Sequence, residues 1–160
     1  MAEKSNKLEP KKPSESESEM AQLVLPNDTN TMGNLFGGIL MQWIDLVGSV
    51  AAKRHCHQTV VTVSMDRLDF LQPAHVGELV VLKARVNRAF NTSMEVGVKV
   101  YTENLKTGER KHTASAYLTM VALNENRRPT AVPPIEASTE EDIRRYHSAE
   151  NRRRQRMTKT

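Results

Sequence analysis

The amino-acid sequence predicts an α+β fold in which one antiparallel sheet wraps around a single long helix. Residues 39–55 form one segment of helical length whose apolar side chains cover nearly every face. After this segment the period changes, because apolar and polar residues alternate through four successive segments, as they do in half-buried strands. Strands of about ten residues each favour a large and strongly curved sheet.

The chain before the helix predicts a short strand followed by a loop. Residues 22–26 (QLVLP) form the strand and end at a proline, and residues 27–33 (NDTNTMG) are crowded with turn-forming residues. Gly37 and Gly38 follow, where the absence of side chains permits a close approach of the backbone. The helix predicted at 39–55 is apolar all round, which is typical of a helix that is buried on every side.

The first strand after the helix contains an irregularity. Apolar residues alternate from Val61 onward, but their parity slips before Leu68, which predicts a β-bulge near Asp66 or Arg67. The sheet is completed by three more alternating segments, with a hairpin loop at 104–108. These segments are 80–86, 94–100 and 114–122. Their outward-facing residues mix charged with apolar side chains, which favours contacts between subunits.

Both ends of the chain are polar, and this divides the sequence into three parts. Residues 1–20 are rich in Lys, Glu, Ser and Pro and are predicted to be disordered, because they cannot bury enough apolar surface to offset the entropy of ordering. Residues 21–125 form the folded domain. Residues 126–160 are predicted to be a linker and a basic helix, which is capped at Ser138-Thr139. Apolar residues are sparse in this helix, so it should dock weakly or only on a partner.

The basic C-terminal part raises the question of an anionic partner. The chain has a formal net charge of +4, and residues 125–160 contain nine Lys or Arg residues and six acidic residues. Such a segment can meet nucleic acid, an anionic membrane or a phosphorylated cofactor. Because charge runs are usually solvated, neither a membrane nor nucleic acid is expected as a partner.

Several classes of protein are excluded by what the sequence lacks. It has one cysteine, no secretory signal and no apolar segment long enough to span a bilayer, so a cytoplasmic location is expected. It has no G-x-S-x-G, H-E-x-x-H, C-x-x-C, G-x-x-x-x-G-K or G-x-G-x-x-G motif. The run His55-Cys56-His57 is not expected to bind a metal, because neighbouring residues of a helix diverge around its axis.

Asp45 is the most informative polar residue of the predicted helix. An ionised carboxylate among apolar neighbours costs several kcal/mol unless it is paired or used in a reaction. Two interpretations stay open from the residues alone, a locally bonded structural aspartate and a functional carboxylate. Gly37 and Gly38 at the start of the helix add weight to the second, because free backbone N–H groups there can polarise a carbonyl oxygen. Asn30 can orient water or substrate, or form an Asx turn.

Three segments of the predicted domain carry the most specific signal in the chain. They are PNDTNTMGNLFGGILMQWIDLVGSVAAKRH, TVSMDRLDFLQPAHVGE and TSMEVGVKVY. In this order and spacing, across about residues 20–125, they resemble the acyl-CoA hydrolase family of hotdog-fold thioesterases, which includes the brain-type enzymes and their bacterial relatives. The resemblance implies a hotdog fold, with a curved antiparallel sheet around one long helix. It also implies dimers with active sites at their interface, usually assembled into a trimer of dimers.

The same resemblance implies an activity and the residues that perform it. The family's catalytic pair falls on Asn30 and Asp45, from different subunits, and its FGG element falls on Phe36-Gly37-Gly38. Asp45 would accept a proton from water, Asn30 would position the water or the carbonyl group, and the glycine amides would hold the oxyanion. The expected reaction is hydrolysis of acyl-CoA to a free fatty acid and CoA, without a metal and without a cofactor other than the CoA of the substrate.

A wider set of residues is expected to contact the substrate. For the strand residues among them, sheet packing and solvent exposure are equally open interpretations. The set comprises Asn34, Phe36, Thr62, Ser64, Asp66, Phe70 and Ser93. The acyl chain length and the residues that bind the CoA phosphates stay open.

Two other functions of this fold are weaker hypotheses. A hydroxyacyl dehydratase needs a histidine that works with a carboxylate, and the predicted helix has none before His55. A non-catalytic acyl-CoA-binding regulator is the alternative that remains. A regulator of transcription would need a DNA-binding helix-turn-helix ahead of the domain, and residues 1–20 are too short and too polar to supply one.

Overall fold

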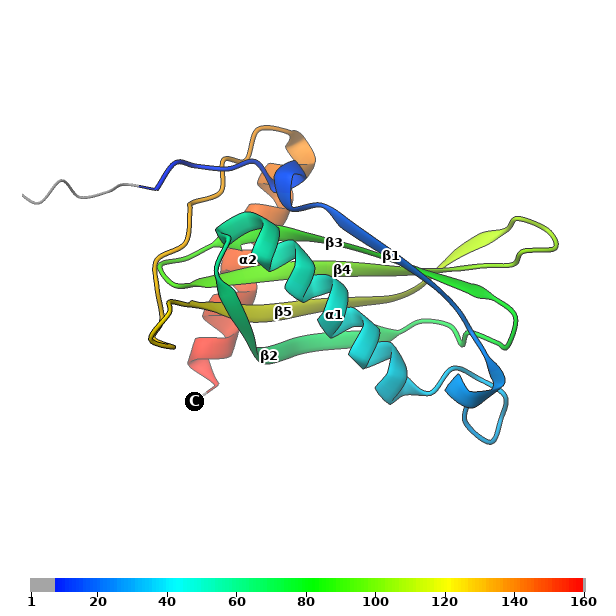
Figure 1. The fold of residues 1–160 in the computed structure, drawn as a ribbon. Coiled ribbons are helices and arrows are strands. Elements are labelled where there is room, and N and C mark those ends of the chain that lie inside the picture. Colours follow the sequence, from blue (N-terminus) through cyan, green and yellow to red (C-terminus); the bar gives the residue numbers. More distant parts are fainter. Residues whose placement is uncertain (1–7, 160) are drawn as a thin grey trace, which may run out of the picture.

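Residues 8–159 are described by the computed structural model, and they form one curved sheet with a helix on each face (Figure 1). Helix α1 (Gly37–Cys56) lies on one face and helix α2 (Glu140–Thr158) on the other. All pairings in the five-stranded sheet are antiparallel, in the order β1-β3-β4-β5-β2. The strands are β1 (Ser18–Leu23), β2 (Thr59–Phe70), β3 (Leu79–Ala89), β4 (Ser93–Glu103) and β5 (Arg110–Leu123). The predicted α+β class, with one long helix wrapped by the sheet and a C-terminal helix, is confirmed.

Helix α1 packs on the sheet through a single stripe of side chains. Leu40, Ile44, Val47 and Ala51 recur at intervals of three or four residues, and none is more than 3% exposed. They meet side chains that alternate along the three central strands. These include Val80, Leu82, Val86, Val96, Val100, Leu118 and Met120. Each buried Leu, Ile or Val side chain contributes about 1.5–3 kcal/mol, so this stripe sets the position of α1 along the sheet.

The opposite side of α1 is not covered by the sheet. Met41, Leu46 and Val50 are 45%, 51% and 44% exposed. The prediction that the helix is buried on every face is therefore wrong for a single chain, because one sheet reaches only one side of a helix. Val61 and Val63 on the edge strand β2 are also exposed, so the apolar surface continues from the helix onto the edge of the sheet.

Strand β2 is irregular where the sequence predicts. Its register with β5 shifts between Met65 and Arg67, which confirms the bulge near Asp66 or Arg67. A second shift lies between Thr62 and Ser64. Each extra residue breaks the strict alternation of faces, so side chains on either side of a bulge can be directed to different surfaces.

The segment before the domain is ordered, which corrects the prediction that residues 1–20 are disordered. Residues 1–7 lie outside the part that the structure describes. After them, Pro13–Ser16 form a 3-10 turn, and β1 begins at Ser18 and pairs with β3. The strand predicted at 22–26 thus starts earlier and runs along the edge of the sheet.

Main-chain and polar contacts, rather than apolar burial, order this N-terminal segment. The Ser16 hydroxyl is fully buried and accepts a hydrogen bond from the Val86 backbone N–H at 2.9 Å. The Lys11 ammonium donates to the His55 carbonyl oxygen at 2.8 Å. The sequence prediction failed because it weighed only the apolar side chains of the segment, whereas backbone groups supply most of the hydrogen bonds of a fold.

Helix α2 begins at the predicted cap. The Thr139 hydroxyl accepts a hydrogen bond from the Asp142 backbone N–H at 3.0 Å, and the Asp142 carboxylate accepts one from the Thr139 N–H at 3.3 Å. Burial by itself would raise the pKa of the Asp142 carboxyl, but the N–H groups of Thr139 and Ser138 and the Arg85 guanidinium hold this pKa below its ordinary value. The Asp142 carboxyl is therefore ionised at neutral pH. The stability that this capping interaction contributes is lost only as the pH falls through the lowered pKa of Asp142.

Arginine side chains anchor α2 to the sheet, which corrects the expectation that it docks weakly or only on a partner. The Arg152 guanidinium lies 3.6 Å from the centroid of the Tyr117 ring and donates to both Glu95 oxygens, at 2.7 and 3.0 Å. In the reverse direction, the Arg88 guanidinium of β3 lies 3.9 Å from the centroid of the Tyr146 ring. Cation–π contacts of this kind contribute about 0.5–2 kcal/mol each, so few apolar residues are needed.

The Arg152–Glu95 pair yields a first prediction, about stability. Glu95 is 3% exposed, so Arg152→Gln leaves a buried carboxylate without its cation and should lower the free energy of unfolding by about 3 kcal/mol. Arg154→Gln is the matched control, because Arg154 is 74% exposed and, among residues 8–159, pairs only with Glu150. Its cost should stay below about 0.5 kcal/mol. Urea unfolding followed by circular dichroism measures both, and equal losses would contradict the assignment of Arg152 as the anchor.

Candidate active site

The loop before α1 holds Asn30 in a defined conformation. The Asn30 Oδ1 accepts hydrogen bonds from the backbone N–H groups of Met32 at 2.9 Å and Asn34 at 3.2 Å. The Asx-turn interpretation is therefore correct, yet it uses only the oxygen of the amide. Among residues 8–159 the Asn30 side-chain NH₂ has no hydrogen-bond partner, so the turn leaves a donor available for a substrate or a water.

The first turn of α1 presents unused backbone donors. The N-cap Phe36 makes no side-chain cap, and within the described chain the N–H groups of Gly37 and Gly38 have no hydrogen-bond partner. A Cβ added to Gly38 would lie 2.7 Å from Cε1 of Phe36, whereas one added to Gly37 would meet Phe70 at an ordinary 3.5 Å. A side chain at position 38 would therefore displace the Phe36 ring. The free N–H groups at this helix start can hold a negatively charged oxygen.

A cleft joins several of the predicted residues. Asn30, Asn34, Gly37 and Phe70 line one open cleft of about 420 Å³. The sequence did not single out its other lining residues. They are Leu35, Leu40, Leu71, Gln72, Pro73, Ala74 and Thr113. The residues from Leu71 to Ala74 (LQPA) follow Phe70 directly in the second segment of the resemblance, so the sequence could have indicated them. Thr113 reaches the cleft only through the pairing of β5 with β2.

Asp45 lies outside this cleft. It is eight residues beyond Gly37 on α1, a rise of about 12 Å along a helix axis. Its side chain is half-buried, and its Oδ1 accepts a hydrogen bond from the Thr62 hydroxyl at 2.6 Å. The full burial expected for Asp45 is not present in a single chain. Asp45 and Thr62 form one cluster on the uncovered side of α1, and Asn30 with Gly37 forms another.

The remaining predicted residues are not brought to the cleft. Ser64 donates a hydrogen bond to Asp66 at 3.3 Å, and Asp66 forms an ion pair with Arg156 of α2, so this part of β2 serves the docking of the C-terminal helix. Ser93 begins β4, and its carbonyl oxygen closes the turn from Phe90 at 2.8 Å. A structural role is thus visible for each, while a role in binding substrate stays a prediction.

The run at the end of α1 is structural. His55 is fully buried and its Nε2 lies 2.6 Å from the Pro133 carbonyl oxygen. Burial is the main cause that lowers the pKa of His55, and burial likewise raises the pKa of the Cys56 thiol. Within residues 8–159, no group of three or more His, Cys, Asp or Glu side chains is placed to hold a metal ion. The same part of the chain contains no helix that is both long and apolar enough to cross a membrane.

Comparisons with known proteins agree with this architecture. Residues 32–109 match the family model of the thioesterase superfamily. A protein of Bacillus subtilis named as an uncharacterized acyl-CoA thioester hydrolase is 44% identical over 136 residues, which are 85% of this chain and 79% of that protein. The crystal structure of a hexameric acyl-CoA thioesterase superposes with a TM-score of 0.92 at 39% identity, covering 95% of this chain and 97% of the other. The chain belongs to the thioesterase superfamily, and its predicted hotdog fold is confirmed.

A second solved structure bears on the individual residues. An acyl-CoA hydrolase from Staphylococcus aureus, in complex with butyryl-CoA and CoA, has a TM-score of 0.88 and 34% identity, covering 93% of this chain and 91% of that protein. Three more structures of this hydrolase carry single alanine replacements, of an asparagine, an aspartate and a threonine. In sequence the three replaced positions are spaced as Asn30, Asp45 and Thr62 are in this chain.

The two glycines at the start of α1 yield a second prediction. Both Gly37→Ala and Gly38→Ala should fold with free energies of unfolding within about 1 kcal/mol of the parent, since alanine is favourable in a helix. Only Gly38→Ala should move the Phe36 ring, because its Cβ needs the space that this exposed ring occupies. The aromatic resonances of Phe36 in an NMR spectrum report the movement, with Gly37→Ala as the matched control. An unchanged Phe36 environment in Gly38→Ala would contradict the close contact.

Proposed function

We propose that this chain hydrolyses acyl-CoA thioesters to a free fatty acid and CoA. One observation carries the proposal: the Asp45 carboxylate is held by Thr62 at 2.6 Å on the same helix whose first N–H groups are unused. The relatives named acyl-CoA hydrolases support the substrate class, and the alanine replacements in the Staphylococcus hydrolase support the choice of Asn30, Asp45 and Thr62.

Each group then has a chemical role. Asp45 acts as the general base that takes a proton from the attacking water, and the Thr62 hydroxyl holds this carboxylate in position. The free N–H groups of Gly37 and Gly38 stabilise the oxyanion that forms when water adds to the thioester carbonyl. The free NH₂ of Asn30 positions the water or the carbonyl oxygen. The thiolate of CoA leaves readily, so no strong general acid is required, and the proposal includes no metal and no cofactor.

The active site is shared between two subunits in this proposal. Asp45 lies about 12 Å along the helix from Gly37, so the base and the oxyanion donors of one chain do not face one reacting carbon. The apolar surface of Met41, Leu46, Val50 and Val63 surrounds the Asp45 side of α1 and suits a second copy of the helix, packed antiparallel. Such a contact would bring Asp45 of one chain to the Asn30 loop of the other. The hexameric neighbour supports a trimer of such dimers.

The cleft at the start of α1 is the proposed channel for part of the substrate. Phe70 lines it and is 53% exposed, and Phe36, between the lining residues Leu35 and Gly37 in sequence, is 54% exposed. An acyl chain or the pantetheine arm would cover these rings. Asn34 lines the same cleft. Ser64, Asp66 and Ser93 remain predicted substrate contacts.

A third prediction tests the base. Asp45→Ala should lower kcat by about 10²–10⁴-fold, the usual contribution of a general base, without unfolding the protein. Asp69→Ala is the matched control, because Asp69 lies on β2 and, in the described part of the chain, pairs only with the exposed Arg67. Thiol release from acyl-CoAs of increasing length measures both variants. Near-normal turnover in Asp45→Ala would remove the assigned role, and failure of the parent protein on every chain length would favour the non-catalytic regulator.

A fourth prediction tests the shared site. Inactive Asn30→Ala and Asp45→Ala proteins are unfolded together, refolded and assayed. In a mixed dimer one site carries both replacements and the other carries neither, so a random mixture should recover about a quarter of the parent activity. A site built from one chain would recover nothing, because every site would hold one replacement. Each variant refolded alone is the control.

A further inference from the structure

The cleft at the start of α1 has an open rim and a closed inner end. Phe70 and Leu71 line it and are more than half exposed, so they belong to the rim. Leu40, Ala74 and Thr113 line the same cleft and are only 2%, 4% and 2% exposed. A side chain that lines an open cleft and is still almost fully buried lies at its inner end. We call these three residues the end wall of the cleft.

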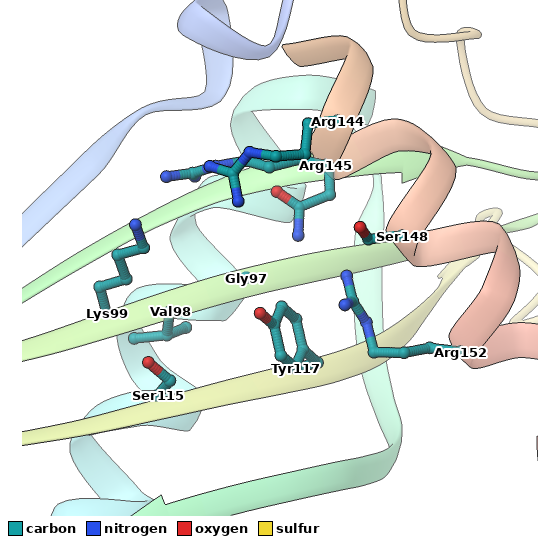
Figure 2. Close-up of a pocket in the computed structure, with 10 residues that line it drawn as sticks. Gly97, Val98, Lys99, Ser115, Tyr117, Arg144, Arg145, Ser148 and Arg152 are labelled. Atoms are coloured by element: carbon teal, nitrogen blue, oxygen red, sulfur yellow. The ribbon is translucent and has the colours of Figure 1, made fainter. Parts of the chain in front are cut away.

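A β-bulge brings Thr113 to the end wall. The register of β5 with β4 shifts at Thr113, which is the extra residue of this bulge. With strict alternation, Thr113 would share a face of the sheet with Ser115 and Tyr117. Figure 2 shows those two residues in a polar pocket of about 70 Å³ around Lys99, between α2 and the sheet. The bulge thus directs Thr113 to the side of α1, and the sheet separates the end wall from the polar pocket.

The end wall offers carbon surface rather than hydrogen bonds. Leu40 and Ala74 have aliphatic side chains. The Thr113 hydroxyl lies 2.5 Å from the Thr102 hydroxyl and donates to the Lys111 carbonyl oxygen at 3.2 Å, so its hydrogen-bonding capacity is used within the sheet. As far as residues 8–159 form the lining of the cleft, it contains no charged side chain. Such an end suits an alkyl chain, because an amide of the pantetheine arm would lose its hydrogen bonds to water there.

The end wall lies close to the proposed oxyanion donors. Leu40 follows Gly37 by three residues, which is a rise of about 4.5 Å along the helix axis. Long side chains of a helix lean toward its N-terminus, so the Leu40 side chain covers the surface next to Gly37. A thioester whose carbonyl oxygen is held by Gly37 and Gly38 therefore has the end wall within reach of its acyl chain.

We propose that Leu40, Ala74 and Thr113 close the acyl end of the cleft and set the longest acyl chain that the protein accepts. This inference rests on the proposed function for the position of the thioester, and it assigns the inner cleft to the acyl group rather than to the pantetheine arm. A chain that ends before the wall is covered along its whole length, whereas a longer chain must turn back toward the rim. One methylene group in an apolar pocket changes selectivity about 10–200-fold, so small changes of the wall should move this limit.

Conservative variants change the depth of the cleft in both directions. Thr113→Ser removes a methyl group and keeps the hydroxyl that meets Thr102, and Leu40→Val shortens the side chain. Thr102→Ser and Leu82→Val are the matched controls, because they make the same changes at buried positions outside the lining of the cleft. Ala74→Val adds methyl groups to the end wall and should make the cleft shallower. Thermal unfolding of each variant verifies that it is folded.

Isothermal titration with free CoA and with acyl-CoAs of increasing length measures the limit. All proteins carry Asp45→Ala, which should slow hydrolysis during the titration. The limit is the first acyl-CoA that the Asp45→Ala protein binds more weakly than the one before it. We expect Thr113→Ser and Leu40→Val to bind this acyl-CoA about tenfold more tightly, Ala74→Val to move the limit to a shorter chain, and both controls to leave it in place. Free CoA should bind to every variant alike.

Several outcomes would overturn the inference. One is a limit that Thr113→Ser and Leu40→Val leave in place, or that the controls move equally. Another is an affinity for free CoA that changes with the end wall, because the wall would then contact the pantetheine arm. Affinity that never falls along the series, or the absence of binding by every acyl-CoA, would also overturn it. A protein with Asp45 intact that releases no thiol from any acyl-CoA, while the limit still moves, would remove the proposed function and leave the end wall in place.

Discussion

The sheet covers α1 from one side only, and the positions of all the candidate catalytic groups follow from this constraint. The buried stripe that includes Leu40 and Ile44 fixes the rotation of the helix about its axis. That rotation puts Asp45 on the uncovered side beside Thr62. The unused N–H groups of Gly37 and Gly38 lie at the start of the helix, where Gly37 lines the cleft. The interaction that stabilises the fold thus also separates the base from the oxyanion donors, and the proposed second subunit is what would reunite them.

The two faces of the sheet are covered by different kinds of interaction. Toward α1 the contacts are aliphatic and fully buried, so they depend on shape and volume. Toward α2 they are made by arginines against aromatic rings and carboxylates, as with Arg152, Tyr117 and Glu95. Polar docking of this kind leaves unfilled space between helix and sheet, lined by donors. The pocket around Lys99 is a direct result of the way α2 is held.

Much of the fold could be predicted from the sequence because its signals are carried by side chains. The change of period after residue 55 marks the end of α1, and the slip of parity near Asp66 marks the bulge. The N-terminal strand was missed in part because its order comes from backbone hydrogen bonds, which leave no trace in composition. The docking of α2 was underestimated because arginine was counted only as a charge, although the guanidinium also stacks on rings.

The candidate site was predictable where its residues belong to the segments that carry the family resemblance. Asn30, Gly37 and Phe70 line one cleft, as the FGG element and its flanking segments suggested. Thr113 was missed because it joins them only through strand pairing across the sheet. The burial of Asp45 was predicted from its apolar neighbours, yet only some of them, such as Ile44 and Val47, are buried in one chain, whereas Leu46 is exposed. A pattern of apolar residues indicates that a surface is covered, but not whether the cover comes from the same chain.

The N-terminal segment also limits the pairing of the sheet edge with strands of other molecules. β1 occupies the edge of β3, a strand with more than half of its residues buried, which would otherwise present open backbone groups for pairing with other molecules. β1 is itself short, and at least half of its residues are exposed. The long edge of β3 is thereby covered, and the exposed edge at this end of the sheet is the short strand β1, which is a poor template for aggregation. β1 therefore limits the addition of further strands at this edge of the sheet.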